Sequence, residues 1–419
     1  MRYLFGFLIC LFLLVPFPVK AEEMVKVKLQ NYIGETPKVT LELKGDYVTL
    51  DPTLTLIEGT EYGLVVKKGR LYLIGGGEEQ LVNGTLALVP RSYDENHVIS
   101  INERPYLGAF EFQVENGIYI RPVNQLPLED YLKGVVPFEV FPSWGIETLK
   151  AQALAARTYA VSHLKADMND TIQYQVYAGY DWKSSTTKAV EETKGEVITF
   201  GNSLIDAFYS ASNGGMTENN VNVWGGKSIS YYPIKADPYD PVNPWEFKLK
   251  RSQIELNEVE WDMANSWEDL VEQDTEITDK MKKWLARNGY SGDIKIVSIP
   301  SFQLSESRLK SERSLRGSIS IQFLQRIIDG TVLYNELKLE DVNLNKIRPM
   351  IGGTLFKSYL IDSLDFNGEY YSMKGRGYGH GVGMSQWGAH FMGEEGKNYK
   401  EILQFYFPGT EITNLSDKS

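Results

Sequence analysis

An alanine-rich stretch at residues 146–164 constrains the fold most, because it predicts a helix that other elements can approach closely. Ser143 is placed to cap this helix, and Glu147 suits the positive end of its dipole. Apolar residues recur at steps of three and four, the spacing of a core-facing helix side, at Ile146, Leu149, Ala153, Ala156, Ala160 and Leu164. Further alanines cover most other faces, so we expect a buried central helix.

A single glutamate, Glu139, lies just ahead of this helix in a predicted turn. Its neighbours Phe138, Val140 and Phe141 are apolar. A carboxyl group held among such side chains loses hydration, which raises its pKa and lets it act as a general acid near neutral pH. The alternative is a turn carboxylate that points into water.

Three motifs in this sequence carry a family resemblance. They are residues 128–159, with Leu-Glu-Asp-Tyr-Leu-Lys-Gly-Val-Val-Pro-x-Glu and Leu-Lys-Ala-Gln-Ala-Leu-Ala-Ala-Arg-Thr-Tyr; Ala207–Glu218; and Gly375–Ala389. In this order they resemble the family of stage II sporulation protein D and the amidase-enhancer proteins of bacterial cell walls. The resemblance runs from about residue 24 onward and is weakest between 246 and 346.

The resemblance implies a lytic transglycosylase that cleaves peptidoglycan glycan strands between N-acetylmuramic acid and N-acetylglucosamine, without a cofactor. Glu139 would protonate the leaving oxygen and then accept a proton from the C6 hydroxyl of muramic acid. A hydrolase would need a second carboxylate across the bond. Two other functions stay open: a non-catalytic enhancer that binds a cell-wall amidase or peptidoglycan, and sugar binding without turnover.

The central helix also offers two cations for the site. Lys150 and Arg157 are seven residues, or about two turns, apart, so both should project from one flank. A cation there could hold the carboxylate of muramic acid or orient Glu139. We therefore predict that both residues contact substrate.

Small polar residues and two glycines follow an apolar strand at residues 210–219. Backbone N–H groups and side chains of this kind suit sugar hydroxyls and acetamides, although a plain turn would choose them too. Because the family places this stretch near the catalytic glutamate, we expect Ser212, Asn213 and Glu218 to bind substrate. Trp224 could stack on a sugar, but aromatic residues next to a strand more often belong to the core.

Alternate glycines from Gly375 to Gly383 predict an extended strip that carries side chains on one face and could line a groove. His380 projects from this strip and could orient substrate or Glu139; the alternative is a buried histidine satisfied by the backbone. A helix is predicted to begin after it, and the resemblance adds Ser385 and Gln386 to the substrate-binding residues.

No metal site is predicted. Some family members place cysteine and histidine zinc ligands just ahead of the Gln-Val-Tyr motif, but those positions carry neither residue here. The four histidines, His97, His163, His380 and His390, form no ligand pair at i, i+4 spacing.

The expected fold class is α+β, with a central alanine-rich helix packed among mixed strands. The predicted parts are a signal peptide or N-terminal membrane anchor at 1–21, a β-rich lobe at 22–125, a catalytic core at 126–245 and 301–419, and a helical insertion at 246–300. The insertion includes Trp261 and Met263 on an apolar face, and the basic run Arg308–Arg316 beyond it is read as a solvated turn, with substrate contact the lesser alternative.

The leader predicts a protein that is secreted, cell-wall associated, or tethered to the outer face of the cytoplasmic membrane. Apart from such an anchor we expect no membrane contact. The net charge of −12 argues against a nucleic-acid partner, which needs a basic surface. The expected partners are glycan strands and, in the enhancer alternative, an amidase.

Overall fold

The computed structural model describes residues 23–54, 56–256 and 267–418, and these divide into two compact units. The first unit holds the described residues up to Tyr131 except Gln30–Tyr32, which belong with Leu132 onward in the second. The predicted leader and the predicted helix positions Trp261 and Met263 lie outside the described residues. Within the described ranges, no helix has both the length and the apolar character needed to cross a membrane.

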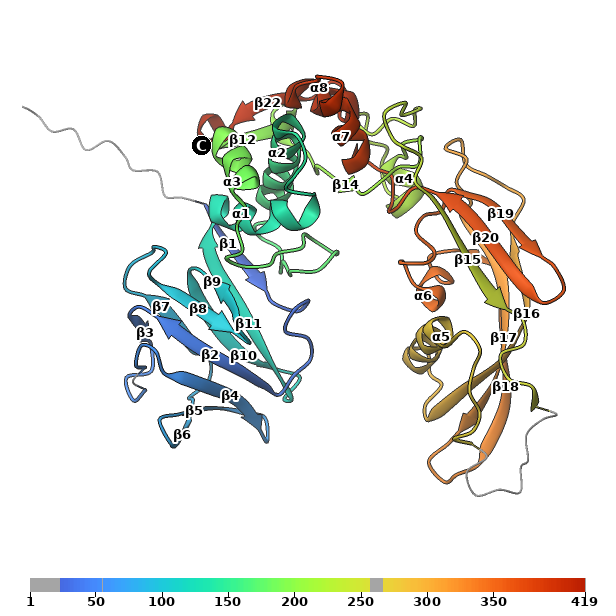
Figure 1. Cartoon of the computed structure of the whole chain (residues 1–419), viewed down its shortest axis with the longest axis horizontal. Coiled ribbons are helices and arrows are strands. Elements are labelled where there is room, and N and C mark those ends of the chain that lie inside the picture. Colours follow the sequence, from blue (N-terminus) through green and yellow to red (C-terminus); the bar gives the residue numbers. More distant parts are fainter. Residues whose placement is uncertain (1–22, 55, 257–266, 419) are drawn as a thin grey trace, which may run out of the picture. The chain divides into compact units, whose positions relative to one another are not determined.

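The first unit consists of antiparallel strands in two sheets and ends in the start of helix α1 (Leu128–Glu139) (Figure 1). The sheet orders are β1-β11-β10-β7-β3 and β6-β5-β4-β2-β8-β9. Alternate side chains are buried along most of these strands, so each sheet presents one apolar face to the core. The strands are β1 (Met24–Lys28), β2 (Lys38–Lys44), β3 (Tyr47–Thr49), β4 (Glu61–Lys67), β5 (Arg70–Gly75), β6 (Glu78–Leu81), β7 (Leu86–Pro90), β8 (Val98–Ile101), β9 (Arg104–Tyr106), β10 (Ala109–Glu115) and β11 (Tyr119–Pro127).

The predicted central helix is α2 (Ile146–Ser162), and almost every residue from Thr148 to Ala160 is buried. It packs against α3 (Ser184–Glu192), and also against β12 (Glu196–Phe200), α7 (Gln386–Glu394) and α8 (Tyr399–Tyr406). This confirms the buried alanine-rich helix, since small side chains let neighbours approach on several faces. The N-cap is Gly145, without a side-chain cap, and not Ser143 as predicted.

Short strands and helices surround α2. The pairing of β14 with β21 is parallel and joins two motifs far apart in the sequence. The sheet order β13-β12-β22 is antiparallel. These elements are β12 (Glu196–Phe200), β13 (Ser203–Leu204), β14 (Tyr209–Ser210), α4 (Asn220–Trp224), β21 (Met384–Ser385), α7 (Gln386–Glu394), α8 (Tyr399–Tyr406), β22 (Glu411–Asn414) and the 3-10 helix η2 (Leu415–Lys418).

The described residues of 244–376 form a body of two antiparallel sheets and two helices, with sheet orders β15-β20-β19 and β16-β17-β18. The predicted helical insertion at 246–300 is therefore corrected: a single described helix, α5, lies there between strands and shares one hydrophobic core with them. The apolar face of α5, with Ile277, Met281 and Leu285, packs into this shared core and does not form the core of a separate helical lobe. The elements are β15 (Pro244–Lys250), α5 (Thr275–Arg287), β16 (Asp293–Leu304), β17 (Arg316–Arg326), β18 (Val332–Asn343), α6 (Arg348–Ile351), β19 (Ile361–Phe366) and β20 (Tyr370–Arg376).

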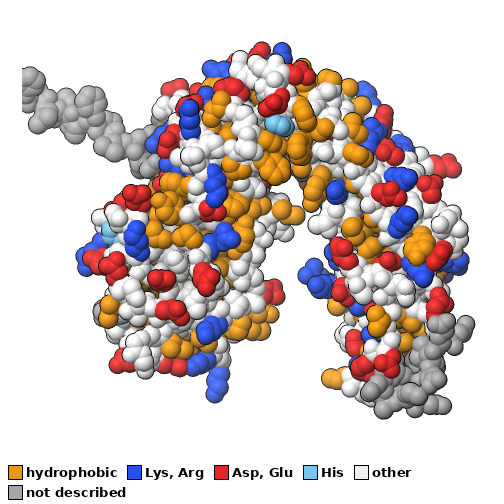
Figure 2. Space-filling model, viewed as in Figure 1, with side chains coloured by type: hydrophobic (Ala, Val, Ile, Leu, Met, Phe, Trp, Pro, Cys, Tyr) orange, Lys and Arg blue, Asp and Glu red, His pale blue; other side chains and the backbone are white. Residues whose placement is uncertain are grey.

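The fold class is α+β, as predicted. Acidic and basic side chains are interspersed over the face drawn in Figure 2.

Candidate active site

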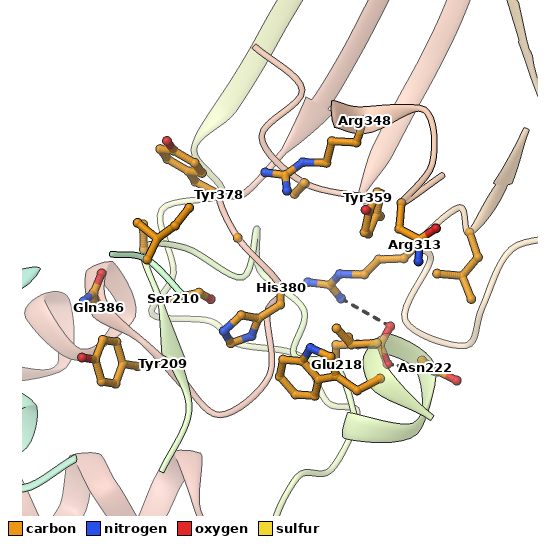
Figure 3. Close-up of a pocket in the computed structure, with 18 of the residues that line it drawn as sticks. Tyr209, Ser210, Glu218, Asn222, Arg313, Arg348, Tyr359, Tyr378, His380 and Gln386 are labelled. Carbon is orange, nitrogen blue, oxygen red and sulfur yellow. Dashed lines mark hydrogen bonds and ion pairs between the residues drawn. The ribbon is translucent and has the colours of Figure 1, made fainter. Parts of the chain in front are cut away.

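A cavity of about 560 Å³ in the second unit brings together four of the predicted site residues (Figure 3). They are Glu139, Glu218, His380 and Gln386. The cavity is further lined by Ile172, Tyr174, Tyr209, Ser210, Ala211, Asn222, Val223, Trp224, Arg313, Leu315, Asn343, Asn345, Arg348, Ser358, Tyr359, Tyr378 and Gly379. In the view of Figure 3, Tyr209 and Gln386 lie to the left of His380, Arg313 lies to its right and Arg348 above it.

Glu139 is the last residue of helix α1. The prediction that it lies in a turn is therefore wrong. The chain near Tyr177 passes very close to this helix, because a Cβ at Gly134 would lie 2.7 Å from that tyrosine ring. The Ala178 N–H donates to the Gly134 carbonyl at 3.1 Å. This close approach brings the Val176 N–H within 2.8 Å of the Glu139 Oε1, where it donates a hydrogen bond.

The Glu139 carboxyl is partly buried, and this burial raises its pKa from 4.5 to about 7. Hydrogen bonds from the Val176 backbone and from the Gln386 and Tyr209 side chains act in the opposite direction, because they stabilise the carboxylate. Burial is the larger effect. A carboxyl with such a pKa is protonated in a substantial fraction of molecules at neutral pH, so it can donate a proton and take one back.

Gln386 is held from both sides. It is the first residue of α7, whose N-cap Ser385 accepts a hydrogen bond from the Gly388 N–H at 3.1 Å. Its Nε2 lies 3.5 Å from the Oε1 of Gln152, a fully buried residue of α2. The two glutamines therefore connect the predicted central helix to the carboxyl of Glu139.

His380 lies in the cavity wall as a neutral imidazole. Burial lowers its pKa to about 4, and the positive charge of Arg313 acts in the same direction. Its Nδ1 accepts a hydrogen bond from the Val382 N–H at 3.0 Å, which leaves the proton on Nε2. The ring packs beside Trp224 and Phe208, with centroid distances of 5.1 and 6.2 Å. A neutral histidine here can hydrogen-bond but does not act as a cation.

Glu218 is the second carboxylate among the described lining residues, and it is already engaged by protein groups. It accepts hydrogen bonds of 2.8 Å from the Asn219 N–H and from the Asn222 Nδ2, and one from the Ser311 hydroxyl. Arg313 lies 4.0 Å away as an ion-pair partner. With 1% of its surface exposed, Glu218 is placed to hold the cavity wall together rather than to attack a substrate.

Ser212, Asn213 and Ser385 do not line this cavity, contrary to the prediction. Their side chains serve two buried aspartates: the Ser212 and Ser385 hydroxyls donate to Asp240 at 2.8 and 2.6 Å, and the Asn213 Nδ2 donates to Asp237 at 2.7 Å. The reason is that both aspartates are buried and need donors. These residues fasten the two motifs together behind the cavity.

Arg157 also lies outside the cavity, which corrects the prediction that it binds substrate. Its side chain is fully buried and hydrogen-bonds to the Thr193 hydroxyl at 3.2 Å and to the carbonyls of Val190 and Glu196 at 3.0 and 3.3 Å. A buried guanidinium needs such acceptors, and α3 and β12 supply them. Arg157 thus ties the central helix to its neighbours.

Lys150 is likewise not a cavity residue. Its ammonium lies 3.3 Å from Glu147 and 2.7 Å from Glu192, so its charge is paired at the α2–α3 surface. The helical spacing did place both cations on α2, but that flank faces α3 and not the site.

The glycine-rich strip is a loop and not an extended strand. Gly375 ends up within β20, but Gly377, Gly379, Gly381 and Gly383 all have φ values between +73° and +113°. A Cβ at Gly383 would lie 2.1 Å from a backbone oxygen, so only glycine fits there. The glycines therefore allow close backbone approach, and the loop still brings His380 to the cavity.

Arg313 is the most informative residue that the sequence interpretation missed. It belongs to the run read as a solvated turn, yet it is 2% exposed and donates to the carbonyls of Asn213 and Met216, both at 3.0 Å. Burial lowers its pKa to about 10. Nothing in its sequence neighbourhood distinguishes it from exposed arginines, because its partners lie about a hundred residues away. Arg348, at the start of α6, completes a cationic end of the cavity.

The described residues contain no group of three or more His, Cys, Asp and Glu side chains arranged to hold a metal ion.

Sequence comparisons identify known proteins that are similar to this chain. The stage II sporulation protein family matches residues 117–200. A protein named amidase enhancer from Bacillus subtilis (strain 168) is 35% identical over 404 residues, covering 95% of this chain and 56% of that protein. An uncharacterized protein of Brachyspira hyodysenteriae is 30% identical over 326 residues, with 76% and 74% coverage. Stage II sporulation protein D of Bacillus subtilis is 28% identical over 318 residues, with 70% and 76% coverage. The chain thus spans little more than half of the amidase enhancer.

Proposed function

This chain belongs to the family of stage II sporulation protein D and the amidase enhancer, and from this premise we propose that it is a lytic transglycosylase of peptidoglycan glycan strands, acting in cell-wall remodelling linked to sporulation. The observation that carries the proposal is the Glu139 carboxyl in the cavity wall, with a pKa of about 7. The protein would be exported to the cell wall or held at the outer face of the cytoplasmic membrane.

One available carboxyl is enough for this reaction. Glu139 donates its proton to the glycosidic oxygen as the bond from C1 of N-acetylmuramic acid to that oxygen breaks. The C6 hydroxyl of the same sugar then attacks C1 and returns its proton to Glu139, which yields a 1,6-anhydro ring and restores the acid. Because the nucleophile belongs to the substrate, its effective concentration is high and no water has to be positioned.

The surrounding groups support this assignment. The Gln386 side chain and the Val176 N–H stabilise the carboxylate that forms between the two proton transfers. Glu218, the other described carboxyl in the cavity, is held by its own donors, which favours transglycosylation over a two-carboxylate hydrolysis. We assign the role of holding the muramic acid carboxylate to Arg348, in place of the two α2 cations.

The test is cleavage of purified glycan strands by the wild-type protein, Glu139→Gln and Glu395→Gln, followed by mass spectrometry of the products. Glu139→Gln keeps the shape of the side chain but cannot transfer the proton, so we expect cleavage to fall by about 10² to 10⁴-fold. Glu395 is an exposed glutamate at the end of α7, and its variant should cleave like the wild type. Cleavage by Glu139→Gln at the wild-type rate would refute the assignment.

A second candidate function follows from the relative named amidase enhancer, which is similar over 95% of this chain. In this alternative the protein binds a cell-wall amidase or peptidoglycan and raises the activity of the amidase without cleaving glycan. Stimulation of a purified amidase should then be equal for the wild type and Glu139→Gln. Equal stimulation with no glycan cleavage by either protein would favour the enhancer.

A further inference from the structure

A second, smaller cavity of about 390 Å³ adjoins the active-site cavity. The two share Ile172, Tyr174, Tyr209, Trp224 and His380 in their walls. An extended ligand can therefore occupy both cavities at the same time.

Trp224 lies in the wall of this smaller cavity. It ends α4 and is 52% exposed, which is unusual for a side chain of this size. It is nevertheless held in place, because the rings of Phe208 and His380 lie 4.5 and 5.1 Å from it, centroid to centroid. A rigid, half-exposed indole offers a flat apolar face to a ligand at little cost in conformational entropy.

The smaller cavity also differs from the larger one in charge. Its described lining contains no Asp, Glu, Lys or Arg, and His380 is neutral at pH 7 because burial lowers its pKa to about 4. The larger cavity is lined by Arg313 and Arg348 (Figure 3). An anionic sugar can therefore pair with a cation in the larger cavity. A neutral sugar needs no such ion pair, so the uncharged wall of the smaller cavity suits it.

We infer that the smaller cavity is a subsite for a neutral pyranose of the N-acetylhexosamine type, stacked on Trp224 beside the sugar held at Glu139. The inference rests on the proposed function, since it extends the same glycan site by one sugar. A pyranose ring has an apolar C–H face and a rim of hydroxyl and amide groups. The indole matches the face, while Gln173 and Tyr174 in the same wall provide polar groups for the rim.

The test is binding of chitotetraose, a neutral N-acetylglucosamine oligomer, measured by isothermal titration calorimetry at pH 7. Trp224→Ala should weaken binding about tenfold, because one stacking contact is lost, and Trp224→Phe should restore most of it. Trp182→Ala is the matched control: Trp182 is also a partly exposed tryptophan but lines neither cavity, and it contacts Lys133 instead. Its affinity should equal that of the wild type.

The outcomes separate the two proposals. Equal affinity of Trp224→Ala and the wild type, or an equal loss in Trp182→Ala, would overturn the subsite. A loss in Arg348→Ala as large as that in Trp224→Ala would contradict the division of charge. Cleavage of glycan strands is measured in parallel on the wild type. Trp224-dependent binding without cleavage would refute the transglycosylase alone, and cleavage with Trp224-independent binding would refute the subsite alone.

Discussion

Replacing Glu139 with glutamine should stabilise the folded protein at alkaline pH. The carboxyl titrates at about 7 in the folded chain but at 4.5 when it is hydrated. The unfolded chain therefore releases this proton first as the pH rises. Below pH 4.5 the Glu139 carboxyl is protonated in both the folded and the unfolded chain, so its ionisation does not lower the free energy of unfolding. The stability that depends on this proton is lost as the pH rises from 4.5 through about 7. Glutamine carries no such proton and escapes this loss.

The size of the effect follows from the shift of the pKa. A change from 4.5 to about 7 corresponds to roughly 3 kcal/mol, at 1.36 kcal/mol for each pKa unit. Because the carboxyl is only partly buried, solvent screening makes this an upper value, and we expect a gain of about 1–3 kcal/mol above pH 8. At pH 4 to 4.5 the two proteins should differ by less than about 1 kcal/mol.

The assay is thermal and urea denaturation of the wild type and Glu139→Gln from pH 4 to 9, with Glu395→Gln as the control. The stability difference for Glu139→Gln should grow between pH 4.5 and 7 and then level off. Glu395→Gln should show no such rise, since its side chain is exposed. A difference that does not depend on pH, or a wild type that is the more stable protein at pH 8, would refute the burial argument.

Three further predictions follow from the contacts around the site. Arg157→Ala should lower the free energy of unfolding by about 2–4 kcal/mol, measured by urea denaturation, and leave glycan affinity per folded molecule unchanged; a folded variant that binds no glycan would return Arg157 to the site. Gln386→Ala removes a hydrogen bond that favours the carboxylate, so the fall of kcat/KM at high pH should move to higher pH; a shift to lower pH would contradict this. Gly383→Ala should reduce the soluble yield strongly, because its Cβ would meet the Phe208 carbonyl oxygen, whereas Gly396→Ala has open space and should fold; equal yields would contradict the close approach.

The sequence predicts the central helix well because its periodicity is local. The burial of α2 and the α+β class follow from alanine spacing and strand alternation alone. Glu139 could also be singled out from its apolar neighbours, although not the helix that carries it. These features depend on residues close together in the chain.

The remaining site depends on distant contacts that no local pattern reveals. Arg157 and Ser212 have the chemistry of ligand-binding residues. In the folded protein, however, Arg157 donates hydrogen bonds to buried carbonyls and Ser212 donates one to a buried aspartate. Arg313 has the pattern of a surface residue and becomes a buried cavity residue only when its loop packs against residues 213–217. Helical spacing predicts on which side of a helix a cation lies. It does not predict which element packs against that side.

The fate of solvent oxygen in the reaction distinguishes a transglycosylase from a hydrolase most directly. Glycan strands are incubated with the wild-type protein in water enriched in ¹⁸O, and the new ends are analysed by mass spectrometry. Because the C6 hydroxyl of the substrate is the proposed nucleophile, we expect 1,6-anhydro-muramyl ends without ¹⁸O, and about 10² to 10⁴-fold slower formation of such ends with Glu139→Gln. Reducing ends that carry ¹⁸O would contradict it and would mean a hydrolase that positions water with a second carboxylate.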